Sequence, residues 1–95
     1  MLSNQEVAEA LLEKFTDQVY DFEEPYGMLT LTTNREEIIS VLSFLKEHAA
    51  YQINFMTDLT GVHYPDNIGK EFAVVYHLHS FIHNFRVRIK VFFFF

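Results

Sequence analysis

The sequence of 95 residues contains no cysteine and only three glycines. Without cysteine, the chain cannot form a disulfide framework, a thiolate metal site or a cysteine nucleophile. Gly27, Gly61 and Gly69 lie too far apart for a phosphate-binding loop or a dinucleotide fingerprint. No apolar run approaches the roughly 18 residues of a membrane span, and the start is polar and acidic, unlike a signal sequence. We therefore expect a cytoplasmic chain with no direct membrane insertion.

Basic residues are also scarce, with 7 lysines and arginines against 13 acidic residues and a net charge of -6. This acid excess disfavours binding to nucleic acid or to an anionic membrane. Residues 1–47 carry ten acidic and three basic side chains, whereas residues 48–95 carry three acidic and four basic ones. Acidic helices packed on a sheet would account for this asymmetry, and a basic strand that faces a partner is the alternative.

Apolar material, by contrast, is abundant, because 49% of the residues are hydrophobic and 17% are aromatic. A chain of this length supports one hydrophobic core. We therefore predict a single domain over residues 1–95.

Two segments have helical patterns. Ser3 and Glu6 form a capping box before apolar residues at helical spacing, which predicts a helix over residues 3–16. Thr33 or Asn34 is the predicted cap of a second helix, whose broad apolar stripe extends to about residue 48.

Five segments have alternating or continuous apolar patterns that predict strands. They are residues 19–23, 28–32, 53–62, 71–82 and 85–94. Turn residues separate the last three segments, which predicts an antiparallel meander. The order helix, strand, strand, helix and three strands indicates a two-layer α+β fold, with both helices on one face of a mostly antiparallel sheet.

The last predicted strand has one cationic and one apolar face. Arg86, Arg88 and Lys90 alternate with apolar residues, so the basic side chains must meet solvent, acidic residues elsewhere, or another chain. The sequence then ends in four phenylalanines, residues 92–95. We expect this aromatic end to be continued by further polypeptide or covered by a neighbour. Self-association through the last strand, by extension of the sheet, is an alternative.

Histidines suggest a second alternative, a small metal-binding module. His77 and His79 are two residues apart on a predicted strand and so share a face, and His63 lies in the preceding loop. With Asp58 or Asp66 as an oxygen ligand, these imidazoles would suit zinc or a similar ion.

Simpler structural roles compete with this chemistry. His77 and His79 could face solvent while Tyr76, Leu78 and Ile82 face the core. Asp58 could serve as a general acid or base if buried, or could bond backbone N–H groups near the end of its strand. No serine has the context of a nucleophile. The sequence therefore offers no active site and no cofactor-binding site.

Three segments together resemble the C subunit of NADH-quinone oxidoreductase, which is the 30-kilodalton subunit family of respiratory complex I. They are FMTDLTGVHYPD at 55–66, FAVVYHLHS at 72–80 and HNFRVRIKV at 83–91. The resemblance implies an α+β domain of the peripheral arm that carries no iron–sulphur cluster or flavin and holds the quinone-site subunits together. The implied partners are other subunits of a respiratory complex, or of a membrane-bound hydrogenase, at the inner face of the cell membrane.

The resemblance also implies roles for single residues. Asp58 and Tyr64 would fix a strand-to-loop turn, and Asn84 would take the left-handed position of a hairpin. Arg86 and Arg88, together with Lys90, would contact partners, because guanidinium groups pair bidentately with carboxylates.

The sequence departs from this family in two places. The family usually has an acidic residue at the position of His63, and its acidic motif after the final strand is missing here. We therefore expect the chain to correspond to the N-terminal domain of the family, without the C-terminal extension.

Overall fold

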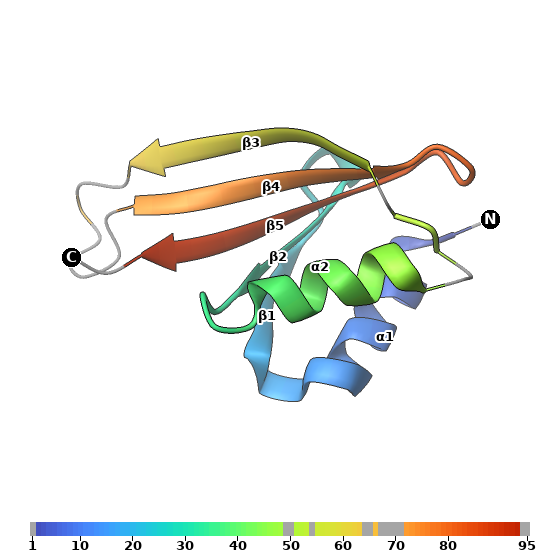
Figure 1. The fold of residues 1–95 in the computed structure, drawn as a ribbon, viewed down its shortest axis with the longest axis horizontal. Coiled ribbons are helices and arrows are strands. Elements are labelled where there is room, and N and C mark those ends of the chain that lie inside the picture. The colour runs from blue at the N-terminus through green and yellow to red at the C-terminus, as the bar shows by residue number, and fades with distance from the viewer. Residues whose placement is uncertain (1, 49–50, 54, 64–65, 67–71, 94–95) are drawn as a thin grey trace.

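The computed structural model describes residues 2–48, 51–53, 55–63, 66 and 72–93 (Figure 1). Two α-helices and five strands occur in the predicted order. Their bounds are α1 Asn4–Phe15, β1 Val19–Glu23, β2 Leu29–Thr33, α2 Ile38–Glu47, β3 Phe55–His63, β4 Phe72–Ser80 and β5 Phe85–Phe93. Short 3-10 turns, η1 at Thr16–Gln18 and η2 at Pro25–Gly27, flank β1.

The strands form one sheet in the order β1-β2-β5-β4-β3. Three of the four pairings are antiparallel, and only β2 and β5 run parallel. Both helices lie on the same face of this sheet (Figure 1). The predicted two-layer α+β fold with a mostly antiparallel sheet is therefore confirmed.

The position of β5 limits the hypothesis of self-association through the last strand. From Val87 to Val91, β5 pairs with β2 along one side and with β4 along the other, so these backbone groups are used within the chain. Sheet extension needs an unpaired edge, and the described edges belong to β1 and β3. From Val87 to Val91, β5 therefore has no free side for sheet extension, because a parallel strand from the N-terminal half covers the side that a meander alone would leave open. Association through the end of the strand stays a prediction, because residues 94–95 lie outside the described residues.

The first helix begins as its capping box predicts. The Glu6 backbone N–H donates to Ser3 Oγ at 3.1 Å, which satisfies one of the free amides of the first turn. Val7, Leu11 and Phe15 are buried, as their helical spacing requires.

The second helix begins later than its capping pattern predicts. The residue before it, Glu37, makes no capping bond with its side chain. Thr33 Oγ1 instead donates to the Gln18 carbonyl oxygen at 2.7 Å, and Asn34 Oδ1 accepts from the Tyr20 hydroxyl at 3.3 Å. The predicted caps were wrong because both side chains hold the end of β2 against β1.

The core lies between the two helices and the inner face of the sheet. The helices contribute Val7, Leu11, Val41 and Leu45, and the parallel pair β2 and β5 contributes Leu29, Leu31, Val87, Ile89 and Val91. These side chains are almost fully buried. The alternation predicted for the last strand is confirmed, because its apolar residues point into this core and Arg86, Arg88 and Lys90 point away from it.

Candidate functional site

The sheet face away from the helices, here called the outer face, receives residues from all five strands. Strand register and alternation place on it Tyr20 and Glu23 of β1, Thr30 and Thr32 of β2, Arg86, Arg88, Lys90 and Phe92 of β5, Ala73, Val75, His77 and His79 of β4, and Asp58, Thr60 and Val62 of β3. Small and β-branched residues thus surround a row of cations.

The floor of the outer face is buried although no helix covers it. Thr30, Thr32, Ala73 and Val75 are each less than a tenth exposed. Long basic side chains lay their apolar stems along neighbouring surface and keep their charged ends in water, which accounts for this burial. A groove of about 310 Å³ remains, lined by Glu23, Pro25, Thr30, Thr60, Val62, Val75, His77, Arg88 and Lys90.

Two arginines on this face have no carboxylate partner within the described residues. Arg88 is half-buried, and its Nε donates to Met28 Sδ at 3.1 Å. Arg86 is exposed, and no hydrogen bond or ion pair to a described residue is formed by its guanidinium. Thioethers are weak acceptors, so both guanidinium groups keep strong donors for another ligand.

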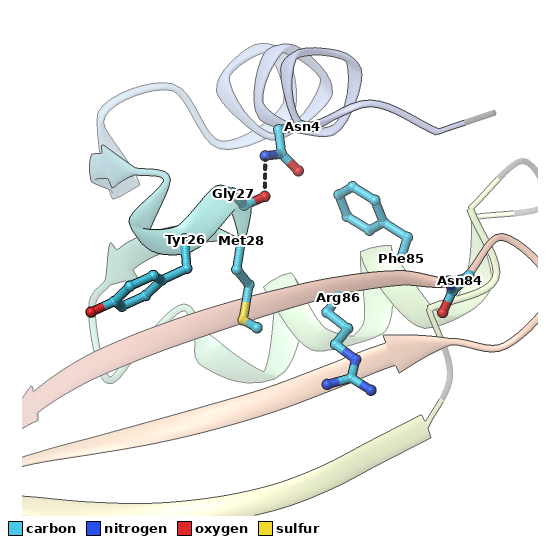
Figure 2. Close-up of a pocket in the computed structure, with 7 residues that line it drawn as sticks. All are labelled: Asn4, Tyr26, Gly27, Met28, Asn84, Phe85 and Arg86. Carbon is cyan, nitrogen blue, oxygen red and sulfur yellow. Dashed lines mark hydrogen bonds between the residues drawn. The ribbon is translucent and has the colours of Figure 1, made fainter.

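A pocket of about 370 Å³ adjoins Arg86 where β5 begins (Figure 2). It is lined by Asn4, Tyr26, Gly27, Met28, Asn84, Phe85 and Arg86. Asn4 Nδ2 donates to the Gly27 carbonyl oxygen at 2.9 Å, which ties the start of α1 to η2. The pocket therefore joins three segments that are far apart in the sequence.

Tyr26, at the edge of this pocket, was missed by the sequence reasoning. Its backbone has φ 54° and ψ 30°, a left-handed conformation that bulky residues adopt rarely, and its side chain is fully exposed. The neighbouring Pro25 and Gly27 predict a turn, but they do not show that the tyrosine itself takes the strained position. Such outliers are frequent at functional surfaces.

His79 and Ile82 do not lie where the simpler interpretation placed them. His79 is only 7% exposed, with Nε2 3.4 Å from Asn84 Oδ1 and its ring centroid 4.5 Å from that of Phe81. Ile82 is 69% exposed, because β4 ends at Ser80 and residues 81–84 form the turn. The predictions of a solvent-facing His79 and an inward-facing Ile82 were therefore wrong.

The three candidate metal ligands do not converge. His63 is the last residue of β3, not part of a loop, and its pairing with Phe72 places it on the face opposite His77 and His79. Its ring stacks on Phe72 with centroids 4.6 Å apart. Among the described residues there is no group of three or more histidines, cysteines or acidic residues that could hold a metal ion. The hypothesis of a site made by His63, His77 and His79 is thus contradicted.

The implied turn residues have different outcomes. Asp58 lies inside β3, at a register irregularity that begins at Met56, and not at the end of the strand as predicted. Its side chain and the whole of Tyr64 lie outside the described residues, so their expected hydrogen bonds stay predictions. Asn84 has φ 49°, the left-handed conformation that the resemblance implied for it.

Within the described part of the chain, neither helix is long and apolar enough to cross a membrane.

Comparisons with protein families and with single proteins indicate the same family. The family model described as "Respiratory-chain NADH dehydrogenase, 30 Kd subunit" matches residues 31–93. The second C subunit of NADH-quinone oxidoreductase in Rhizobium etli (strain CIAT 652) is 41% identical over 81 residues, which cover 84% of this chain and 42% of that protein. The C subunit of the same enzyme in Geobacter sulfurreducens is 37% identical over 90 residues, which cover 95% of this chain and 54% of that protein. The chain therefore spans about half the length of these relatives.

Solved structures share the fold. The trypsin-resistant fragment (1-134) of Nqo5 superposes with a TM-score of 0.73 and 28% identity, over 93% of this chain and 68% of that one. A chain of the archaeal membrane-bound sulfane sulfur reductase, a respiratory membrane complex, has the same TM-score at 21% identity, over 93% of this chain and 48% of that one. At that identity, the second similarity concerns the fold alone.

Proposed function

The chain belongs to the family of the 30 kDa subunit of respiratory-chain NADH dehydrogenase, and from this premise we propose that it is a non-catalytic subunit, or domain, of NADH-quinone oxidoreductase. Its role would be to hold subunits of the peripheral arm together near the site of quinone reduction. In the assembled complex it would lie at the inner face of the membrane and contact protein only.

The observation that carries this proposal is the one-sided sheet. Helices cover the inner face, whereas the outer face presents Arg86 and Arg88 without carboxylate partners among the described residues. Arginine is enriched in protein interfaces, because its planar group makes several directed hydrogen bonds. A cationic sheet face that no helix covers is thus suited to contact another subunit.

The family relationship and the outer face favour a binding role over chemistry of the chain's own. The polar side chains of the outer face are mainly threonines, histidines and cations spread along neighbouring strands. General acid–base catalysis requires a titratable group positioned against a reacting atom within a pocket. The groove beside Arg88 contains the titratable side chains of Glu23 and His77, but most of its lining is β-branched or cationic.

Deletion of the gene in its source organism tests the proposal. We expect the amount of assembled complex on native gels and the NADH-quinone reductase activity of the membranes to fall together. Expression of the intact gene from a plasmid should restore both. A complex that assembles fully without this chain would refute the role.

The purified chain supplies the second test. We expect no oxidation of NADH and no visible chromophore. A flavin or iron–sulphur absorption spectrum that co-purifies in stoichiometric amount would overturn the proposal of a non-catalytic subunit.

A further inference from the structure

We propose that the outer face binds an acidic segment of a partner subunit, in which two carboxylates about 7 Å apart pair with Arg86 and Arg88. This inference rests on the proposed function and adds the chemistry of the partner. It assigns the recognition to two residues and predicts a feature of the partner's sequence.

The spacing follows from the strand. Arg86 and Arg88 are alternate residues of β5, so they share a face and their Cα atoms are about 7 Å apart. Acidic residues separated by one position in an extended segment have the same spacing, and residues four apart on a helix come within about 6 Å. Either arrangement lets each guanidinium form a bidentate pair with its own carboxylate.

Charge complementarity identifies the occupant. The chain has six more acidic than basic residues, yet the described outer-face positions of β2, β4 and β5 carry no acidic residue. The exposed glutamates of α1 lie on the other side of the sheet, and Glu23 of β1 pairs with Thr30, which places its backbone two strands, or about 10 Å, from that of Arg88. Asp58 of β3 pairs with His77, which places its backbone two strands, or about 10 Å, from that of Arg88. Neither β5 nor its two neighbouring strands thus offer the arginines a carboxylate on this face, and we assign the matching pair to another molecule.

The side chain of Arg88 has limited freedom before a ligand binds. It is half-buried over the threonine floor, and its Nε donates to Met28 Sδ at 3.1 Å. Figure 2 shows Met28 and Arg86 extending to the same side of β5. Limited freedom before binding lowers the entropy lost when a complex forms.

The surface beside Arg86 and Arg88 lets the partner's acidic segment approach β5 closely. Thr30, Thr32 and Val75 make a low floor beside the arginines, and the exposed Tyr26 is one of the residues that line the pocket next to Arg86. Tyrosine and arginine are among the residue types that most often dominate binding energy at interfaces. The acidic segment is thus expected to extend along β5 toward Tyr26.

The first experiment compares two charge-reversal variants in the intact complex. The double variant R86E/R88E changes the net charge by -4, and the control R35E/K46E changes it by the same amount at exposed positions around α2. We expect at least a tenfold loss of assembled complex on native gels for R86E/R88E and normal assembly for the control. R86K/R88K, which keeps the charge but loses bidentate pairing, should be intermediate.

Folding is checked separately, because Arg88 is partly buried. The single variant R86E changes an exposed side chain, and urea unfolding of the purified chain should be unaltered for it. Its assembly should still fall severalfold. Normal assembly of both R86E and R86E/R88E, in cells where deletion of the gene abolishes the complex, would overturn this inference and leave the proposed function standing.

The second experiment identifies the partner segment. In the complex with R86K, a carbodiimide that joins amines to carboxylates without a spacer should link the new amine at position 86 to an aspartate or glutamate of another subunit. Mass spectrometry should show a second acidic residue two positions or one helical turn away. Linkage to a segment with a lone carboxylate, or to α1 of a second copy of this chain, would contradict the proposal.

Discussion

Asn84 determines how the hairpin between β4 and β5 turns. Its φ of 49° costs most residues about 1–2 kcal/mol, and its Oδ1 lies 3.4 Å from Nε2 of the buried His79. We expect Asn84→Ala to lower the free energy of unfolding by about that amount, and Asn84→Gly to lower it less, because glycine adopts positive φ without strain. Urea unfolding of both variants measures the difference. Equal losses would show that the bond to His79, and not the backbone conformation, is the larger contribution.

Ionisation of the Tyr51 hydroxyl is expected to lower the stability of the chain at alkaline pH. Burial raises the pKa of its hydroxyl above the ordinary value of 10.0, and the carboxylates of Glu6 and Glu13 raise it further. Because the folded state holds this proton more tightly, stability is constant below pH 10 as far as Tyr51 is concerned, and is lost as the pH rises through the folded pKa. We expect Tyr51→Phe to reduce the loss of stability above pH 10.

Thermal unfolding at pH values between 8 and about 11.5 measures this loss of stability, because the pKa of Tyr51 lies above pH 8 in both the folded and the unfolded state. Glu13→Gln is the matched partial variant, because it removes one of the two negative charges and leaves the burial of the phenol. It should weaken the alkaline loss without abolishing it. A Tyr51→Phe profile that is parallel to that of the wild type would contradict the assignment.

At the scale of an element, the packing of its apolar face is the main contribution to the stability of α2. It has no side-chain cap at its start, and Val41 and Leu45 are fully buried in the core. We expect Leu45→Ala to lower the free energy of unfolding by about 2–5 kcal/mol, the usual loss for a buried leucine. Leu42→Ala should cost less because Leu42 is only half-buried. Ile39→Ala, at a position that is 71% exposed, is the control and should change little. Chemical denaturation measures all three.

Local patterns predicted the elements better than their connections. Ser3 and Glu6 cap α1 as expected because both partners lie within one turn. Thr33 and Asn34 do not cap α2, since they bond to Gln18 and Tyr20 about 15 residues away. A sequence pattern records which residues could cap a helix, but not which distant backbone group competes for the same side chain. The left-handed Tyr26 escaped prediction for a similar reason, because tyrosine gives no local signal for that conformation.

The candidate site was predictable in part. The alternation of Arg86, Arg88 and Lys90 with apolar residues correctly placed the cations on one face of the last strand. The neighbours of that face could not be deduced, because β2 lies beside β5 through a parallel pairing between residues almost 60 positions apart. That pairing brings Met28 to Arg88, and it separates the chain's own acidic helix from the arginines.

At the scale of the whole molecule, the two faces of the sheet have different physical characters. The inner face is covered by helices and excludes water through apolar packing. The outer face carries long cationic side chains over a floor of small and β-branched residues, and its arginines keep donors for a ligand. A family member built in this way can fold around one core and still present a full sheet face to a neighbour.

The strand order makes β5 the most protected element. From Val87 to Val91, β5 is paired with β2 on one side and β4 on the other, so successive amides donate alternately to two strands. We expect all amides of this segment to exchange with solvent only through global unfolding, with an opening free energy equal to that of denaturant unfolding. Hydrogen exchange followed by NMR measures this residue by residue. If β5 were an edge strand, as the meander alone allows, every second amide would exchange quickly, and that alternating pattern would refute the central position from which the arginines of the outer face are presented.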